Sequence, residues 1–197
     1  SSTPAAGQCT PAPSWGTSRP ELAAQVVTLV NRHRASRGLR QLGVSASLTQ
    51  ASTWKSLHMA GLGYFAHDDP GPPAARSAYQ RARDCGFDGT GWGENIAWGY
   101  ATAESVLGGW LDSPGHRANI ENGSFTSIGV GAASRGGRLY WTQAFGTGGS
   151  GVKPVAAAKR TVAIGGTPAH VGRTASGGLV ASVTFVHLQS GRPLTGG

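Results

Sequence analysis

The chain has 197 residues and a formal net charge of +8, a length that suits one packed domain and a short appendage. Its basic residues form no clustered stripe, so we expect no nucleic-acid partner. No run of 18 apolar residues occurs, so we expect no transmembrane segment. The opening residues lack the charged and apolar regions of a signal peptide, which indicates an export signal that was removed or never present.

The charge is unevenly distributed along the chain. All nine acidic residues precede position 122, whereas the last 47 residues carry five basic residues and no acidic one. A basic balance of this kind favours anionic partners such as membrane surfaces or wall polymers.

Two cysteines, Cys9 and Cys85, stand far apart in the sequence and have no Cys-x-x-Cys partner. This spacing argues against a structural zinc site and favours one long-range disulfide formed in an oxidising compartment. Two buried free thiols are the alternative.

The front of the chain predicts an arm and two helices. Residues 1–17 are rich in Pro, Ser, Ala and Gly, and only Cys9 and Trp15 could fasten this arm to a core. Ser18 is the expected cap of a helix that runs to Gly38. The pattern Ser-Leu-Thr-Gln at 47–50 predicts the cap of a second helix, ending near 63, whose apolar face also carries Lys55 and His58. We expect His33 and His58 to be packed or surface histidines.

An irregular stretch over residues 68–93 follows, with a short helix near 75–83, and its length is typical of a functional loop. Thr102 and Ser113 are expected to cap two further helices, the second with Pro114 in its first turn. Alternating segments on either side of 134–137 then predict a β-hairpin.

These patterns divide the chain into an arm (1–17), a main domain (18–147), a linker (148–159) and a β-rich tail (160–197). The tail contains two expected strands, at 160–164 and 179–188, which are too few for a core of their own. It is therefore either the first part of an immunoglobulin-like sandwich or a strand pair that docks on the main domain.

Three polar motifs interrupt this framework: Tyr64-Phe-Ala-His67, Gly93-Glu94-Asn95-Ile-Ala97 and Trp110-Leu-Asp-Ser-Pro-Gly-His116-Arg117-Ala-Asn-Ile120. In their order and spacing they resemble the bacterial branch of the CAP superfamily, which comprises cysteine-rich secretory proteins, antigen 5 and plant pathogenesis-related proteins. The resemblance covers roughly residues 18–147. It implies an α+β fold, a three-layer α-β-α sandwich, in an extracellular or cell-surface protein.

The resemblance also implies that His67 and Glu94, both from loops, point into a shared cleft with His116 as a third member. Eukaryotic relatives typically present two histidines and two glutamates there. In this chain Ser113, beside Asp112, stands at the second glutamate position, and Phe125 stands at the strand position of the second histidine.

Two imidazoles and one carboxylate form the ligand set of many catalytic zinc sites, so His67, Glu94 and His116 are candidate ligands of a divalent metal. Without a metal, Glu94 could take a proton while a neighbouring histidine stabilises charge. These residues could instead hydrogen-bond across the cleft only to fix the loops.

Three further residues belong to the predicted cleft. They are Asn95, which is expected to hold its loop through backbone hydrogen bonds, Arg117, which is expected to pair with Asp112 or Glu121, and Ser113.

The favoured function is a secreted, monomeric binding module for lipid, wall glycan or protein. A metal-dependent hydrolase acting on peptide or wall material is one alternative, and a displayed structural surface protein is another. The sequence contains no Gly-x-Ser-x-Gly, phosphate-loop or His-Glu-x-x-His motif, so the main hydrolase and nucleotide-binding patterns are missing.

Overall fold

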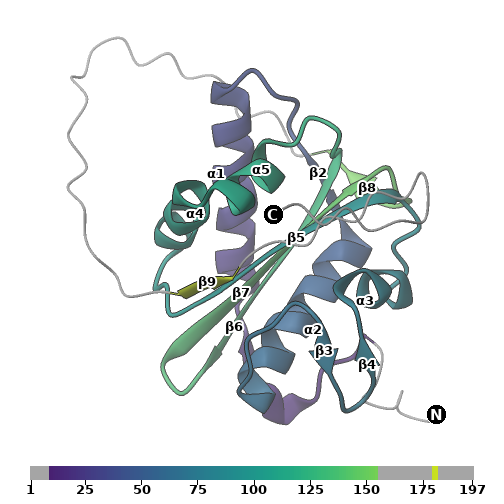
Figure 1. Ribbon diagram of the computed structural model, residues 1–197, viewed down its shortest axis with the longest axis vertical. Helices are drawn as coiled ribbons and strands as arrows, with labels where there is room; N and C mark the ends of the chain where they lie inside the picture. Colours follow the sequence, from purple (N-terminus) through teal and green to yellow (C-terminus); the bar gives the residue numbers. More distant parts are fainter. Residues whose placement is uncertain (1–8, 155–178, 182–197) are drawn as a thin grey trace.

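A computed structural model describes residues 9–154 and 179–181 of the chain. Within these residues a seven-stranded sheet has the order β8-β2-β6-β7-β5-β9, and β1 pairs with β6 outside this path (Figure 1). The strands are β1 (Thr17–Ser18), β2 (Gly43–Ser45), β5 (Thr90–Trp98), β6 (Ser127–Arg135), β7 (Arg138–Thr147), β8 (Val152–Lys153) and β9 (Leu179–Ala181). A separate small hairpin consists of β3 (Asp69–Pro70) and β4 (Ala75–Arg76).

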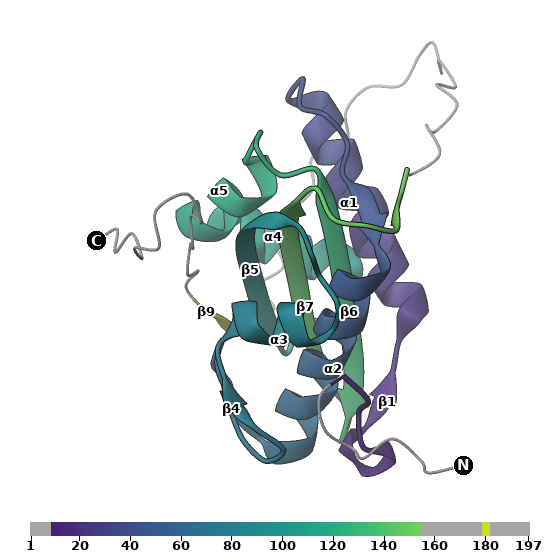
Figure 2. The same cartoon turned by 90° about the vertical axis from the view of Figure 1, so that its right-hand side faces the viewer.

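Helices cover both faces of the sheet, which confirms the predicted three-layer α+β architecture (Figure 2). One layer contains α1 (Pro20–Ser36), α4 (Ala103–Asp112) and α5 (Pro114–Glu121), and the other contains α2 (Ala46–Leu62) and α3 (Ala78–Asp84). A buried apolar cluster lies on each side, the larger one beneath α1 and α4 and the smaller one beneath α2 and α3. Among the described residues, no helix is both long enough and apolar enough to cross a membrane.

The sequence of β6 explains how α2 packs so closely on the sheet. Ile128, Val130 and Ala132 point toward the larger cluster, while Gly129 and Gly131 alternate with them and face α2. A side chain on either glycine would collide with the α2 backbone. This close approach lets Ser52 and Ser56 on α2 donate hydrogen bonds to the carbonyls of Gly129 and Gly131, at 3.1 and 3.0 Å.

The predicted caps of the first two helices are wrong. Ser18 belongs to β1, where it pairs with Ala133, so Arg19 occupies the N-cap position of α1 without a side-chain capping bond. At α2 the cap is Ser45, the last residue of β2, whose hydroxyl accepts a bond from the Leu48 amide. In both places strand pairing decides where the helix can begin.

The later elements follow the prediction more closely. Thr102 caps α4 in a capping box with Ser105, and Ser113 precedes α5. The β6–β7 hairpin turns at Gly136 and Gly137, both with positive φ (56° and 76°), as a tight turn with the right-handed strand twist requires. Phe125 lies just before β6, not in a strand, and stacks on Phe145 in the core.

The arm is attached at the two predicted points. Cys9 forms a disulfide with Cys85, which confirms the predicted bridge. Trp15, in the short helix η1 (Pro13–Trp15), packs edge-on against Trp54 and His58 of α2, with ring centroids 5.4 and 4.8 Å away. His58 is fully buried, as expected for a packed histidine.

Parts of the predicted linker and tail add to the main sheet. Val152–Lys153, within the expected linker, pairs with β2. Leu179–Ala181, at the start of the expected second tail strand, pairs antiparallel with β5 at Ile96–Trp98. The expected strand at 160–164 and residues 182–188 lie outside the described residues.

Candidate functional site

Glu94 lies in the middle of β5, not in a loop as the sequence suggested, and is only 1% exposed. Its carboxylate lies on the α2 and α3 side of the sheet, because it contacts Arg81 of α3 and His67 from the segment after α2. Asn95, the next residue, bonds to α5 on the opposite face. Alternation along the strand therefore sends the two polar residues of one motif to different layers.

Glu94 uses both carboxylate oxygens. Oε1 is 2.9 Å from Nδ1 of His67, and Oε2 accepts a hydrogen bond from Nη2 of the buried Arg81 guanidinium. Arg81 also donates to the His67 carbonyl at 3.2 Å. The predicted meeting of His67 and Glu94 is therefore present, and Arg81 holds both of them.

A buried ionic network, absent from the prediction, continues from this pair. It consists of Lys55, Asp69, Arg76, Arg81 and Glu94. Asp69 receives Arg81 at 2.6 Å and Lys55 at 2.9 Å on Oδ1, and Arg76 at 3.0 Å on Oδ2. The side chains of Lys55, Asp69 and Arg81 are fully buried. A lysine on the apolar face of the second predicted helix was the one sequence signal of this network.

The network fixes the loop that carries His67. Lys55 donates to the Asp68 carbonyl at 3.1 Å and to the Tyr64 hydroxyl at 3.0 Å. Nδ1 of His58 lies 2.6 Å from the same hydroxyl. The position of His67 thus depends on charges buried beneath it.

Electrostatics keep Glu94 ionised. Burial alone would raise the pKa of its carboxyl group, but the Arg81 charge and the His67 contact outweigh burial and lower the pKa from 4.5 to about 2. Burial also lowers the pKa of Lys55, from 10.5 to about 8. Glu94 is therefore a weak base at neutral pH and a poor candidate for taking a proton in a reaction.

His116 occupies the first turn of α5 and is 2% exposed. Its Nδ1 lies 2.7 Å from the Ser113 hydroxyl. Its Nε2 is buried and has no hydrogen-bond partner among the described residues. Burial first, and then the neighbouring His67, lower the pKa of His116 from 6.5 to about 4, so the ring is neutral at pH 7.

The other two predicted cleft residues hold α5 in place. Asn95 donates to the His116 carbonyl at 3.2 Å and accepts from Asn119 at 2.9 Å, a tie between β5 and α5. Arg117 donates to the Leu111 carbonyl instead of pairing with an acid. Its predicted pairing is wrong because Glu121 is already bonded to His33 and Arg37.

The proposed metal ligands do not fit a zinc site in this arrangement. Within residues 9–154 and 179–181, no three His, Cys, Asp or Glu side chains are placed to hold one ion. Both oxygens of Glu94 are already engaged, one of them by a guanidinium whose positive charge opposes a second cation.

With helices on both faces of one mixed sheet, the protein is a three-layer α-β-α sandwich. The family model described as the cysteine-rich secretory protein family, CAP, matches residues 27–145. The chain belongs to this family.

Known relatives agree with this assignment. The chain is 38% identical over 121 residues to uncharacterized protein YkwD of Bacillus subtilis, covering 61% of this chain and 45% of that protein. An extracellular SCP-domain protein of Bacillus anthracis is similar in structure, with a TM-score of 0.57 and 28% identity over 66% of this chain and 41% of its own. An outer surface protein of Borrelia burgdorferi shares the fold, with a TM-score of 0.58, 19% identity and coverage of 67% of this chain and 98% of its own. The chain thus spans less than half the length of the two Bacillus proteins.

Proposed function

We propose that this chain is a secreted binding module in which the region around Glu94 and His116 recognises a neutral hydrogen-bonding group of a wall ligand. The group would be an amide or a hydroxyl of a wall glycan or of its attached peptide. A disulfide and the extracellular and surface proteins among its relatives support secretion.

The observation that carries the proposal is that Nε2 of His116 is buried and has no hydrogen-bond partner in the part of the chain that the structure describes. A buried polar atom without a partner costs about 1–3 kcal/mol, so such atoms need an explanation. The bond between His116 Nδ1 and Ser113 holds the ring in place. A ligand group that reached Nε2 would regain the missing hydrogen bond.

The charges of the site favour a neutral ligand. Arg81 compensates the Glu94 carboxylate, and the His116 ring is uncharged because burial and His67 lower its pKa to about 4. Neither group offers an uncompensated charge to a ligand ion. Recognition would therefore rest on hydrogen-bond geometry more than on charge.

The test is a calorimetric titration with a disaccharide–tetrapeptide wall fragment, which carries both amides and hydroxyls. His116→Phe removes both ring nitrogens and keeps a similar shape, and we expect it to weaken binding by about tenfold or more. His33→Phe is the matched control, because His33 pairs with Glu121 at the other end of α5. Equal affinity of wild type and His116→Phe, or no binding by the wild type, would overturn the proposal.

A further inference from the structure

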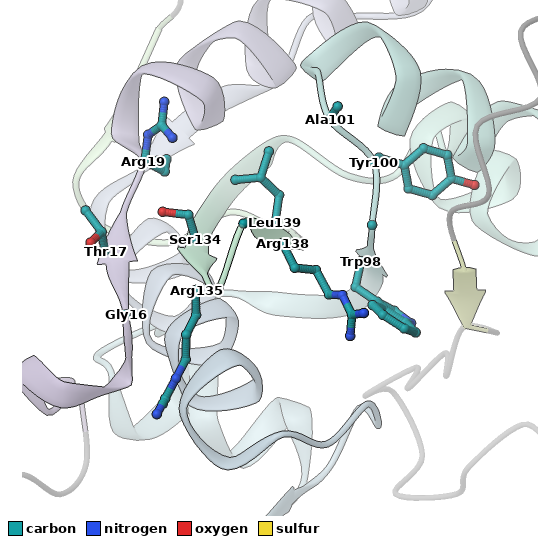
Figure 3. Close-up of a pocket in the computed structure, with 13 residues that line it drawn as sticks. Gly16, Thr17, Arg19, Trp98, Tyr100, Ala101, Ser134, Arg135, Arg138 and Leu139 are labelled. Carbon is teal, nitrogen blue, oxygen red and sulfur yellow. The ribbon is translucent and has the colours of Figure 1, made fainter.

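A hollow lies at the tip of the β6–β7 hairpin, beyond the end of β5, and His67, Arg81, Glu94 and His116 are not among the residues that line it. It has a volume of about 1030 Å³ and is lined by β1, the hairpin turn and the segment that follows Trp98 (Figure 3). We call it the hairpin groove. Its volume lies at the upper end of the range typical of ligand pockets.

Three arginines line the hairpin groove: Arg19, Arg135 and Arg138. Among the described residues that line it there is no Asp or Glu. Arg19 is bonded to Glu21 at 2.5 Å, whereas Arg135 and Arg138 form no ion pair with any carboxylate of the described residues. The groove therefore keeps an excess of positive charge.

Arg135 and Arg138 place two positive charges at the hairpin turn. They are register partners, directly opposite one another across the turn. Like charges in that position destabilise a strand pair. The two side chains point away from each other (Figure 3), so their charges are separated and both remain available to a ligand.

Both arginines are nevertheless held in place by uncharged partners. The Arg138 guanidinium lies over the Trp98 ring, 4.0 Å from its centroid, and Arg135 Nη1 donates to the Gly61 carbonyl at 2.8 Å. Figure 3 shows Arg138 beside Trp98, with Ser134 and Thr17 on the other side of the hairpin. Such contacts order an arginine without neutralising its charge.

From this arrangement we infer that the hairpin groove binds an acidic glycan, a saccharide chain that bears carboxylate or phosphate groups. Guanidinium groups pair with both kinds of anion in a bidentate way. The hydroxyls of Thr17 and Ser134, which also line the groove, suit the hydroxyl-rich rest of a sugar chain.

The same residues argue against a nucleic acid or a membrane as the partner. The Trp98 ring is covered by Arg138 and lies nearly parallel to Tyr140, so it is a poor platform for stacking a base. Within the described residues, Leu62 is the one large hydrophobic residue that is exposed. Leu62 does not line the groove. Among its described lining residues, the groove therefore has no exposed large apolar side chain that could insert into a lipid surface.

The test measures binding of three probes at low salt: tetragalacturonate for carboxylates, a phosphorylated mannotetraose for phosphates, and neutral maltotetraose. We expect one or both acidic probes to bind, maltotetraose not to bind, and the double variant Arg135→Gln/Arg138→Gln to lose affinity by about tenfold or more. Whichever acidic probe binds more tightly identifies the anion. Arg138→Lys keeps the charge but not the bidentate geometry, and is expected to lie between wild type and the double variant.

The matched control is Arg32→Gln/Arg83→Gln, which removes the same charge from exposed positions on α1 and α3 outside the groove. An equal loss in this control would show that net charge alone attracts the probes and would overturn the inference. The inference would also be overturned if neither acidic probe bound to the protein. Binding of oligothymidylate as tightly as the acidic probes would overturn it as well. His116→Phe is expected to leave binding of the acidic probes unchanged, so the two sites are tested independently.

Discussion

Arg81 of α3 and Glu94 of β5 form an ion pair in the interior, and the same guanidinium also bonds to the buried carboxylate of Asp69. One arginine therefore links the central sheet, the α3 layer and the loop that carries His67. The side chains of Arg81, Asp69 and Glu94 are all buried, so neither carboxylate would reach water if Arg81 were replaced.

Replacing Arg81 should thus destabilise the fold strongly. We expect Arg81→Met to lower the free energy of unfolding by about 3–5 kcal/mol, since it leaves buried charge uncompensated. Urea unfolding measures the loss, and Arg83→Met, at an exposed position of the same helix, should change little. The double variant Arg81→Met/Glu94→Gln should recover part of the loss; a loss no larger than that of Arg83→Met would contradict the role of the pair.

Glu94 should make the protein sensitive to strong acid. Its folded pKa of about 2 lies below the ordinary value of 4.5, so its contribution is fully present above about pH 4.5 and is lost as the pH falls toward 2. The shift corresponds to about 3 kcal/mol. Urea midpoints measured across this range should fall steeply for wild type and less steeply for Glu94→Gln. Parallel curves for the two proteins would refute this assignment.

His116 should act in a different pH window. Because its folded pKa of about 4 is below the ordinary value of 6.5, the unfolded chain binds the proton more readily and stability declines as the pH falls from about 6.5 to about 4. The loss approaches about 3 kcal/mol. His116→Phe should flatten this part of the stability curve and leave the more acidic part unchanged. Ring titration by NMR provides a direct check, since a midpoint near 6.5 in the folded protein would exclude the shift.

The sequence predicted the architecture better than the interior of the site. Glycine pairs, prolines and alternating residues are local features, and they identified the hairpin and the helices near their observed positions. The caps at Ser18 and Ser47 were misplaced because strand pairing at β1 and β2 competes for the same segments. Local capping preference does not include that competition.

The buried ionic network could not be predicted because its members come from separate segments. Lys55 lies on α2, Asp69 on β3, Arg81 on α3 and Glu94 on β5, and only the packed layers bring them together. The sequence interpretation places Glu94 in a loop, whereas Glu94 and the residues on either side of it form strand β5. The unusual position of Lys55 on an apolar helix face was the one clue available.

The glycines of β6 should be intolerant of even one added methyl group. At Gly131 a Cβ atom would collide with the α2 backbone at Ser52, so Gly131→Ala should cost about 1–3 kcal/mol through forced movement of the helix. Gly108, in α4, has open space around it, and Gly108→Ala should stabilise by about 0.5–1 kcal/mol. Thermal unfolding of the two single variants compares them directly. A neutral effect at Gly131 would mean that α2 can move away from the sheet at little cost.

The disulfide between Cys9 and Cys85 joins the arm to the end of α3, across 76 residues of chain. A cross-link over a loop of this size restricts the unfolded chain, so the Cys9→Ser/Cys85→Ser variant should lose about 2–4 kcal/mol. The loss should appear as a lower urea midpoint, and reduction of the wild type should reproduce it. Intact mass after alkylation checks the bond itself, because oxidised protein should take up no label. Two labelled thiols before reduction would disprove the bridge. If the bridge is intact but the Cys9→Ser/Cys85→Ser variant is as stable as the wild type, Trp15 and β1 alone hold the arm to α2 and β6.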